Sequence, residues 1–100
     1  MQIFSEQEQQ DISVDYLQHT VEDEHLDFSR AKDIAKKLAF QKCSQSMILS
    51  WKNGITGEFY PTYECGGEQK PAWIHYAEAR GANLTIDING GQYIFMLLKF

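Results

Sequence analysis

The fold is decided by residues 83–100, NLTIDINGGQYIFMLLKF. Two strand-like runs, 84–88 and 93–98, flank a turn sequence at 89–91, and this pattern predicts a β-hairpin. Three side chains of each run share a face whichever two residues make the turn, because a slip of two residues preserves side-chain parity. These six are Leu84, Ile86, Ile88, Tyr93, Phe95 and Leu97. We expect them to form the core face of a sheet.

The opposite face of this hairpin is uneven. One strand places Thr85 and Asp87 there, whereas the other places Ile94, Met96 and Leu98. A strand that is apolar on both sides is covered twice, either inside its own fold or by another copy of the protein. The sequence therefore predicts that Ile94, Met96 and Leu98 are covered, either by the protein's own helices or by a second copy in a homodimer.

A helix is predicted over residues 28–39. Apolar side chains gather on one side at helical spacing, and basic side chains gather on the other. Asp27 or Ser29 offers a short side-chain oxygen for the N-cap. Phe40 falls on the polar side and predicts the end of the helix.

A second hairpin is predicted from residues 46–52 and 55–61, SMILSWK and ITGEFYP. Asn53 and Gly54 lie between them, and a type I′ turn requires the positive φ that these two residues tolerate best. The resulting register mixes apolar and polar side chains on each face. Gly57 is therefore expected to mark a bulge that repairs the pattern.

A second helix is predicted over residues 71–80, because Pro71 suits the first turn and Gly81 suits the position just past a helix. Together the elements predict one small α+β domain in the order α-ββ-α-ββ. Its sheet is antiparallel and consists of two hairpins, with both helices packed on one face.

Charge is divided unevenly along the chain. Residues 1–28 hold eight acids and no Lys or Arg, whereas the other residues hold nine bases and six acids. Residues 1–11 have too few apolar side chains to offset the entropy lost on ordering. Residues 12–27 fit both strand and helix spacing, and we favour a short helix. The predicted domains are an acidic, partly flexible segment, 1–27, and an α+β domain, 28–100.

The predicted compartment is the cytoplasm. No apolar run approaches the ~20 residues of a membrane span, and no secretory signal is present at the start of the sequence. We therefore expect no membrane partner. In a reducing compartment Cys43 and Cys65 are expected to be free thiols.

The densest group of functional side chains is the loop of residues 60–70, YPTYECGGEQK. Loops on a rigid scaffold carry binding residues, and aromatic side chains supply large contact areas. We therefore predict that Trp51, Tyr60, Tyr63 and Cys65 bind a partner. The alternative interpretation is that the two tyrosines only extend the core and the glycines only form a turn.

Catalytic and cofactor chemistry finds little support in the sequence. A thiol-dependent enzyme would use Cys65 with His75 as its base, but the charge of Glu64 opposes a thiolate next to it. No C-x-x-C or H-x-x-x-H pair and no glycine-rich nucleotide motif is present, so we expect no metal and no cofactor.

Single-stranded nucleic acid is a second alternative partner. The basic face of helix 28–39 and the aromatic side chains have suitable chemistry. The net charge of −5 and the acidic segment 1–27, which would mask the helix, disfavour this partner. The leading hypothesis is a small non-catalytic protein-interaction or regulatory domain, acting on a protein partner or as a homodimer.

Overall fold

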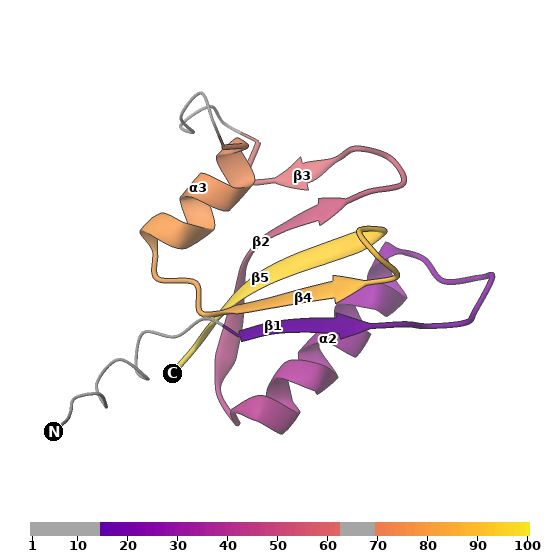
Figure 1. The fold of residues 1–100 in the computed structure, drawn as a ribbon, viewed down its shortest axis with the longest axis horizontal. Coiled ribbons are helices and arrows are strands. Elements are labelled where there is room, and N and C mark those ends of the chain that lie inside the picture. The colour runs from indigo at the N-terminus through magenta and orange to yellow at the C-terminus, as the bar shows by residue number, and fades with distance from the viewer. Residues whose placement is uncertain (1–14, 63–69) are drawn as a thin grey trace, which may run out of the picture.

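The computed structural model describes residues 15–62 and 70–100 (Figure 1). These residues form a small α+β domain with two helices on one five-stranded mixed sheet, which confirms the predicted fold class. In chain order the elements are β1 (Asp15–His19), α2 (Phe28–Lys42), β2 (Ser46–Asn53), β3 (Phe59–Tyr60), α3 (Ala72–Ala79), β4 (Leu84–Ile88) and β5 (Tyr93–Lys99). The strands lie in the order β1-β4-β5-β2-β3. Only the β1–β4 pair is parallel among these residues.

The β4–β5 hairpin has the predicted core face. Its register pairs Ile88 with Tyr93, and all six predicted core side chains are at most 2% exposed. The turn residues Asn89, Gly90 and Gly91 have φ values of 57°, 62° and 99°. Glycine and asparagine adopt this left-handed region at the lowest cost, so the turn sequence suits its conformation.

Helix α2 covers this core face. Its buried stripe consists of the small side chains of Ala31, Ala35 and Ala39, each 0% exposed. They pack against the buried side chains of β4 and β5, and this cluster is the larger of the two cores. A carboxylate oxygen of Asp27 accepts a hydrogen bond from the backbone N–H of Arg30 at 2.9 Å, so Asp27 is the N-cap.

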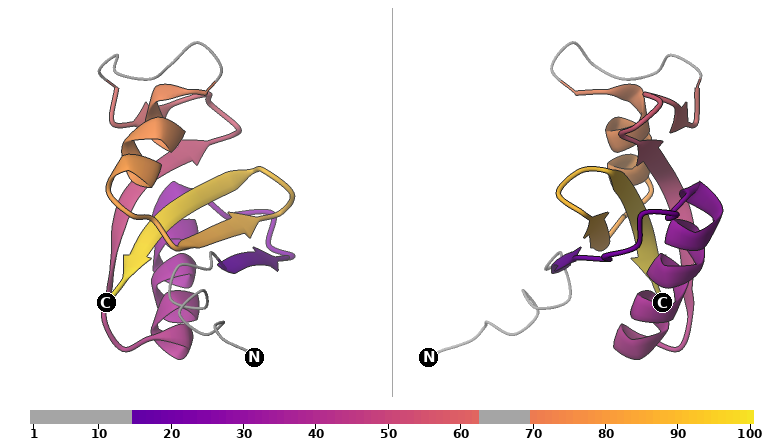
Figure 2. Two further views of the ribbon diagram at one scale, coloured as in Figure 1. Left: turned by 60° about the vertical axis from the view of Figure 1, so that its left-hand side comes forward. Right: turned by 90° about the vertical axis from the view of Figure 1, so that its right-hand side faces the viewer.

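Helix α3 lies on the opposite face of the sheet, so the prediction that both helices share one face is wrong (Figure 2). The helix stays within the predicted range 71–80. Its buried residues Trp73 and Ala77 pack against Leu49 and Met96. Because β5 is apolar on both sides, each face of the sheet centre buries apolar area against its own helix. The chain itself therefore supplies the cover predicted over the second face of β5.

The acidic segment contributes an edge strand, β1, where a short helix was expected. β1 alternates its side chains, and Leu17 packs against the core that α2 covers. The chain just beyond β1 is held by Asn89, whose side-chain oxygen accepts from the N–H of Val21 at 2.8 Å and whose amide donates to the Val21 carbonyl at 3.2 Å. Part of the acidic segment thus belongs to the sheet.

The β2–β3 connection is not the predicted type I′ turn, because neither Asn53 nor Gly54 has positive φ. The positive φ is at Gly57, 86°. The side-chain oxygen of Asn53 instead accepts hydrogen bonds from the backbone N–H groups of Ile55 and Thr56, and these bonds close a wider loop. The backbone N–H of Gly54 donates to the carbonyl of Gln92 in the other hairpin at 2.7 Å. This contact between the two loops overrides the local turn preference.

Strand β3 is short, and it pairs only with Trp51 and Lys52 of β2. Pro61 follows it, and proline has no N–H with which to continue a ladder. The bulge expected at Gly57 is confirmed: the N–H of Gly57 donates to the carbonyl of Asn53 and the N–H of Asn53 donates to the carbonyl of Glu58, both at 2.8 Å, so two residues oppose one. A separate irregularity lies in β2, where the register with β5 shifts between Ile48 and Ser50. The sheet is therefore irregular on both sides of β2.

Candidate functional site

A surface hollow lies between α2 and the first half of β2. It encloses about 420 Å³. A second hollow of about 290 Å³ adjoins it, because both are lined by Lys32 and Ile48. We name the two together the α2–β2 groove. Its lining residues are Lys32, Lys36, Phe40, Ser44, Ser46, Met47, Ile48, Trp51, Tyr60 and Leu97.

One wall of the groove is a row on α2. Lys32, Lys36 and Phe40 are spaced four residues apart and therefore lie one above the other along one side of the helix. The prediction that α2 ends at Phe40 is wrong, because the helix continues to Lys42. Phe40 is 67% exposed. A large apolar side chain on the polar side of a helix is thus part of the groove.

The other wall is formed by β2 and β3. Ile48 and Met47 lie beside the end of the α2 row that carries Phe40, and Met47 is 48% exposed. Trp51 and Tyr60 close the far end with their rings stacked, 6.3 Å apart at an angle of 17°. Trp51 also contacts the ring of Phe28, with centroids 4.4 Å apart and the ring planes at 52°. The tryptophan therefore packs against two rings, which fixes the shape of this end.

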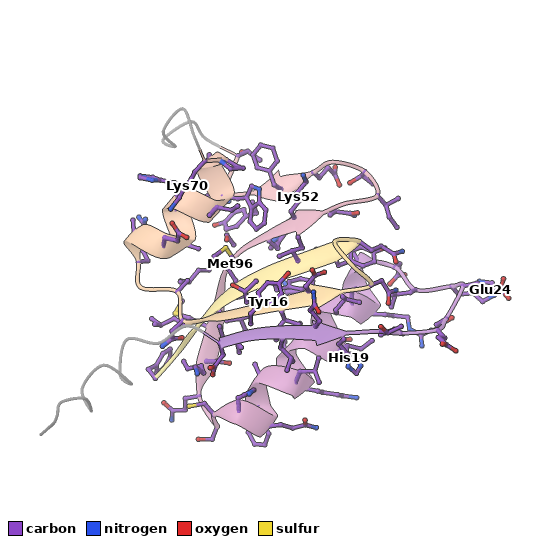
Figure 3. The ribbon with its side chains drawn as sticks, viewed as in Figure 1. Tyr16, His19, Glu24, Lys52, Lys70 and Met96 are labelled. Atoms are coloured by element: carbon purple, nitrogen blue, oxygen red, sulfur yellow. The ribbon has the colours of Figure 1, made fainter. Side chains whose placement is uncertain are left out.

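The groove carries the positive charge of Lys32 and Lys36. The ion pairs among residues 15–62 and 70–100 are Arg30–Asp23, Lys70–Glu78 and Lys99–Asp15. Lys32 and Lys36 belong to none of them. The acidic loop before α2 compensates only the first turn of the helix, and Figure 3 shows Glu24 at its projecting tip. The groove thus combines exposed apolar surface, stacked aromatic rings and two ammonium groups that form no ion pair with the residues that the structure describes.

The predicted binding residues are partly brought together. Trp51 and Tyr60 meet in the groove, whereas Tyr63 and Cys65 lie outside the residues that the structure describes. His75 is exposed on α3, and its relation to Cys65 is likewise outside those residues. Cys43 is a free thiol that contacts the backbone carbonyl of Phe100 at 3.3 Å.

The residues proposed for self-association lie on the other face, under α3. Met96 is 7% exposed, and Ile94 and Leu98 are half-buried and pack against the same cluster. Figure 3 shows Met96 between α3 and the open part of the sheet. Covering these side chains therefore requires no second subunit.

Sequence reasoning missed the α2 wall and Met47. The signal was present in Phe40, because an aromatic side chain among lysines at four-residue spacing is out of place on a solvated face. The position of the groove itself depends on where α2 crosses the sheet. That crossing has no local signature in the sequence.

A polar cluster lies on the same face of the sheet as α3, in the part that this helix does not cover. The Tyr16 hydroxyl donates to the buried carboxylate of Asp87 at 2.7 Å, and the backbone N–H of Gly91 donates to its other oxygen. The hydrogen bond to Asp87 and partial burial raise the pKa of Tyr16 above its ordinary value. Because the carboxylate is shared between β1 and the β4–β5 turn, this cluster holds the edge strand in place.

Residues 15–62 and 70–100 contain no clustered set of metal ligands and no membrane-spanning helix. No group of three His, Cys, Asp or Glu side chains lies close enough to hold a metal ion there. Neither described helix has the length and apolar character of a bilayer span.

The fold defines a class: a small α+β domain whose two helices lie on opposite faces of a five-stranded mixed sheet, with a groove between one helix and an outer strand. Residues 14–97 match the model of the family described as a domain of unknown function, DUF5619, and the chain belongs to this family. The family match begins immediately before β1.

One solved structure is similar over nearly the whole domain. It is the crystal structure of the protein AF1514 from Archeoglobus fulgidus, described as novel, with a TM-score of 0.74 and 30% sequence identity. The similarity covers 87% of this chain and 95% of that one. No curated protein gives a significant match to this chain.

Proposed function

We propose that this domain is a non-catalytic protein-interaction module whose partner binds in the α2–β2 groove. The observation that carries the proposal is the concentration of exposed apolar side chains along one groove: Phe40 and Met47 line its larger hollow, and Tyr60 lines the second. Apolar area that is left exposed in a patch and rimmed by polar groups is typical of interaction sites. Two of the residues predicted from the sequence, Trp51 and Tyr60, border the second hollow.

Single-stranded nucleic acid is less well supported as the partner. Recognition of single strands requires free ring faces on which bases stack. Trp51 already packs against the rings of Phe28 and Tyr60. The apolar end at Phe40 and Met47 also has no role in binding a phosphate backbone.

The proposal is tested by comparing the proteins that three forms of the full chain retain from an extract of its own cells. Met47→Asp places a charge in the groove. Ile55→Asp is the matched control, since Ile55 is 60% exposed and lies outside the groove. We expect one or more proteins to be retained by the wild type and by Ile55→Asp but lost with Met47→Asp, while circular dichroism shows all three to be folded. Equal retention by all three forms would contradict the proposal.

A further inference from the structure

We infer that the partner of the α2–β2 groove is an acidic polypeptide segment that places apolar side chains at the Phe40–Met47 end and carboxylates opposite Lys32 and Lys36. This inference rests on the proposed function and adds the chemistry of the partner. The groove is polarised along its length: an apolar end, a cationic middle and an aromatic end.

The cationic middle sets the charge of the partner. Lys32 and Lys36 are one helical turn apart on the same side of α2, and neither forms an ion pair within the described part of the chain. An apolar partner would cover these ammonium groups without compensating them, which costs solvation free energy. A partner with carboxylates at these two positions replaces water by charge-assisted hydrogen bonds.

The apolar end sets the rest of the partner. Phe40 and Met47 flank the larger hollow, and Ile48 and Leu97 line it. An apolar side chain of the partner that enters there removes exposed apolar area on both molecules, which favours binding. A ligand that is only a polyanion would leave this apolar area exposed to solvent.

A second copy of the chain fits this groove poorly. Two copies related by a two-fold axis through the groove would bring Lys32 and Lys36 of one copy against the same lysines of the other, and like charges that face each other across an interface are unfavourable. The acidic side chains of residues 22–24 lie at the opposite end of α2 from Phe40. They therefore do not compensate such a contact.

The experiment is a selection from a phage-displayed library of random peptides on the immobilised full chain, with counter-selection on Lys36→Glu. We expect the enriched peptides to combine Asp or Glu with apolar residues. A fluorescein-labelled synthetic copy of the most enriched peptide should bind Lys36→Glu at least about tenfold more weakly than the wild type at low salt. Lys37→Glu is the matched control, since it makes the same charge change on the same helix outside the groove, and it should weaken binding less than about threefold.

Each contrary outcome overturns the inference in a recognisable way. Enriched peptides without an excess of acids, but with binding lost in Met47→Asp, would leave the groove as a protein site and refute only the acidic partner. Peptides that bind Met47→Asp as tightly as the wild type, or no enrichment at all, would refute the inference and the proposed function together. Equal weakening of peptide binding by Lys36→Glu and Lys37→Glu would show that the effect comes from the net charge of the protein and not from the groove.

Two further measurements identify competing occupants. Tight binding of oligothymidylate that is lost with Tyr60→Ala would identify a single-stranded nucleic-acid site instead. A mass that doubles with concentration in sedimentation, and that stays single with Met47→Asp, would identify a second copy as the occupant.

Discussion

Replacing Gly54 with alanine should destabilise the domain by about 2–4 kcal/mol. A Cβ at this position would lie 2.1 Å from the backbone carbonyl oxygen of Gly91, and the nearest atoms are backbone and not flexible side chains. Ordinary carbon–oxygen contacts lie near ~3.3 Å, so one of the two loops must move by more than about 1 Å. That movement breaks the 2.7 Å hydrogen bond from the N–H of Gly54 to the carbonyl of Gln92.

The lost hydrogen bond accounts for about 1 kcal/mol, and the displaced loops account for the remainder. In a domain of this size each kcal/mol lowers Tm by roughly 4–8 °C. The assay is urea unfolding followed by tryptophan fluorescence and circular dichroism, with the free energy of unfolding obtained from the midpoint and slope.

Gly90→Ala is the control for this prediction. Gly90 has a φ of 62° but open space where a Cβ would be, so alanine there costs only backbone strain, about 1–2 kcal/mol. We expect Gly54→Ala to cost clearly more, although Gly54 has no positive φ. If Gly54→Ala is no more costly than Gly90→Ala, the close approach of the two loops is not a determinant of stability.

Three further predictions concern stability. Asn89→Ala should lower the free energy of unfolding by about 2–4 kcal/mol, because it removes the side-chain hydrogen bonds that hold the chain after β1 and strains a positive φ. Amide hydrogen exchange should then accelerate in β1 more than in β5. Met96→Asp should cost at least about 3 kcal/mol by burying a carboxylate beneath α3, and the emission of the adjacent Trp73 should shift to the red if the protein stays partly folded. Lys99 lowers the pKa of Asp15 below its ordinary value of 3.8 through a hydrogen bond and its charge, so this contribution to stability is present above that value and is lost as pH falls through the lowered pKa. Lys99→Met should therefore flatten the loss of stability in acid, and an unchanged acid profile in urea unfolding would contradict the pairing.

Elements determined by nearby residues were predicted correctly from the sequence. The β4–β5 hairpin and the helix that follows Pro71 both carry their own turn and cap signals, and the N-cap Asp27 precedes an unambiguous helical stripe. Elements determined by distant contacts were not. β1 is a strand because β4 offers it an edge, and the turn at Gly54 is displaced because another loop approaches its backbone.

The candidate site divides in the same way. The aromatic residues Trp51 and Tyr60 were predicted from residue type and from their place beside a loop. Lys32 and Lys36 were treated only as part of the basic face of helix 28–39, because their relation to Met47 arises from the crossing of α2 over the sheet. Residue type therefore predicted the chemistry of one end of the groove, and the tertiary structure added the rest.

The parallel pairing of β1 with β4 has a consequence for synthesis. Asn89 and Val21, whose hydrogen bonds hold this edge in place, are 68 residues apart in the chain. Closing so long an intervening loop is entropically costly, and contacts of this separation form late. On the ribosome β1 must wait, unpaired, until β4 has been translated and has left the exit tunnel. A chaperone that shields the nascent chain would therefore be expected to contact the region of β1 until β4 becomes available to pair with it.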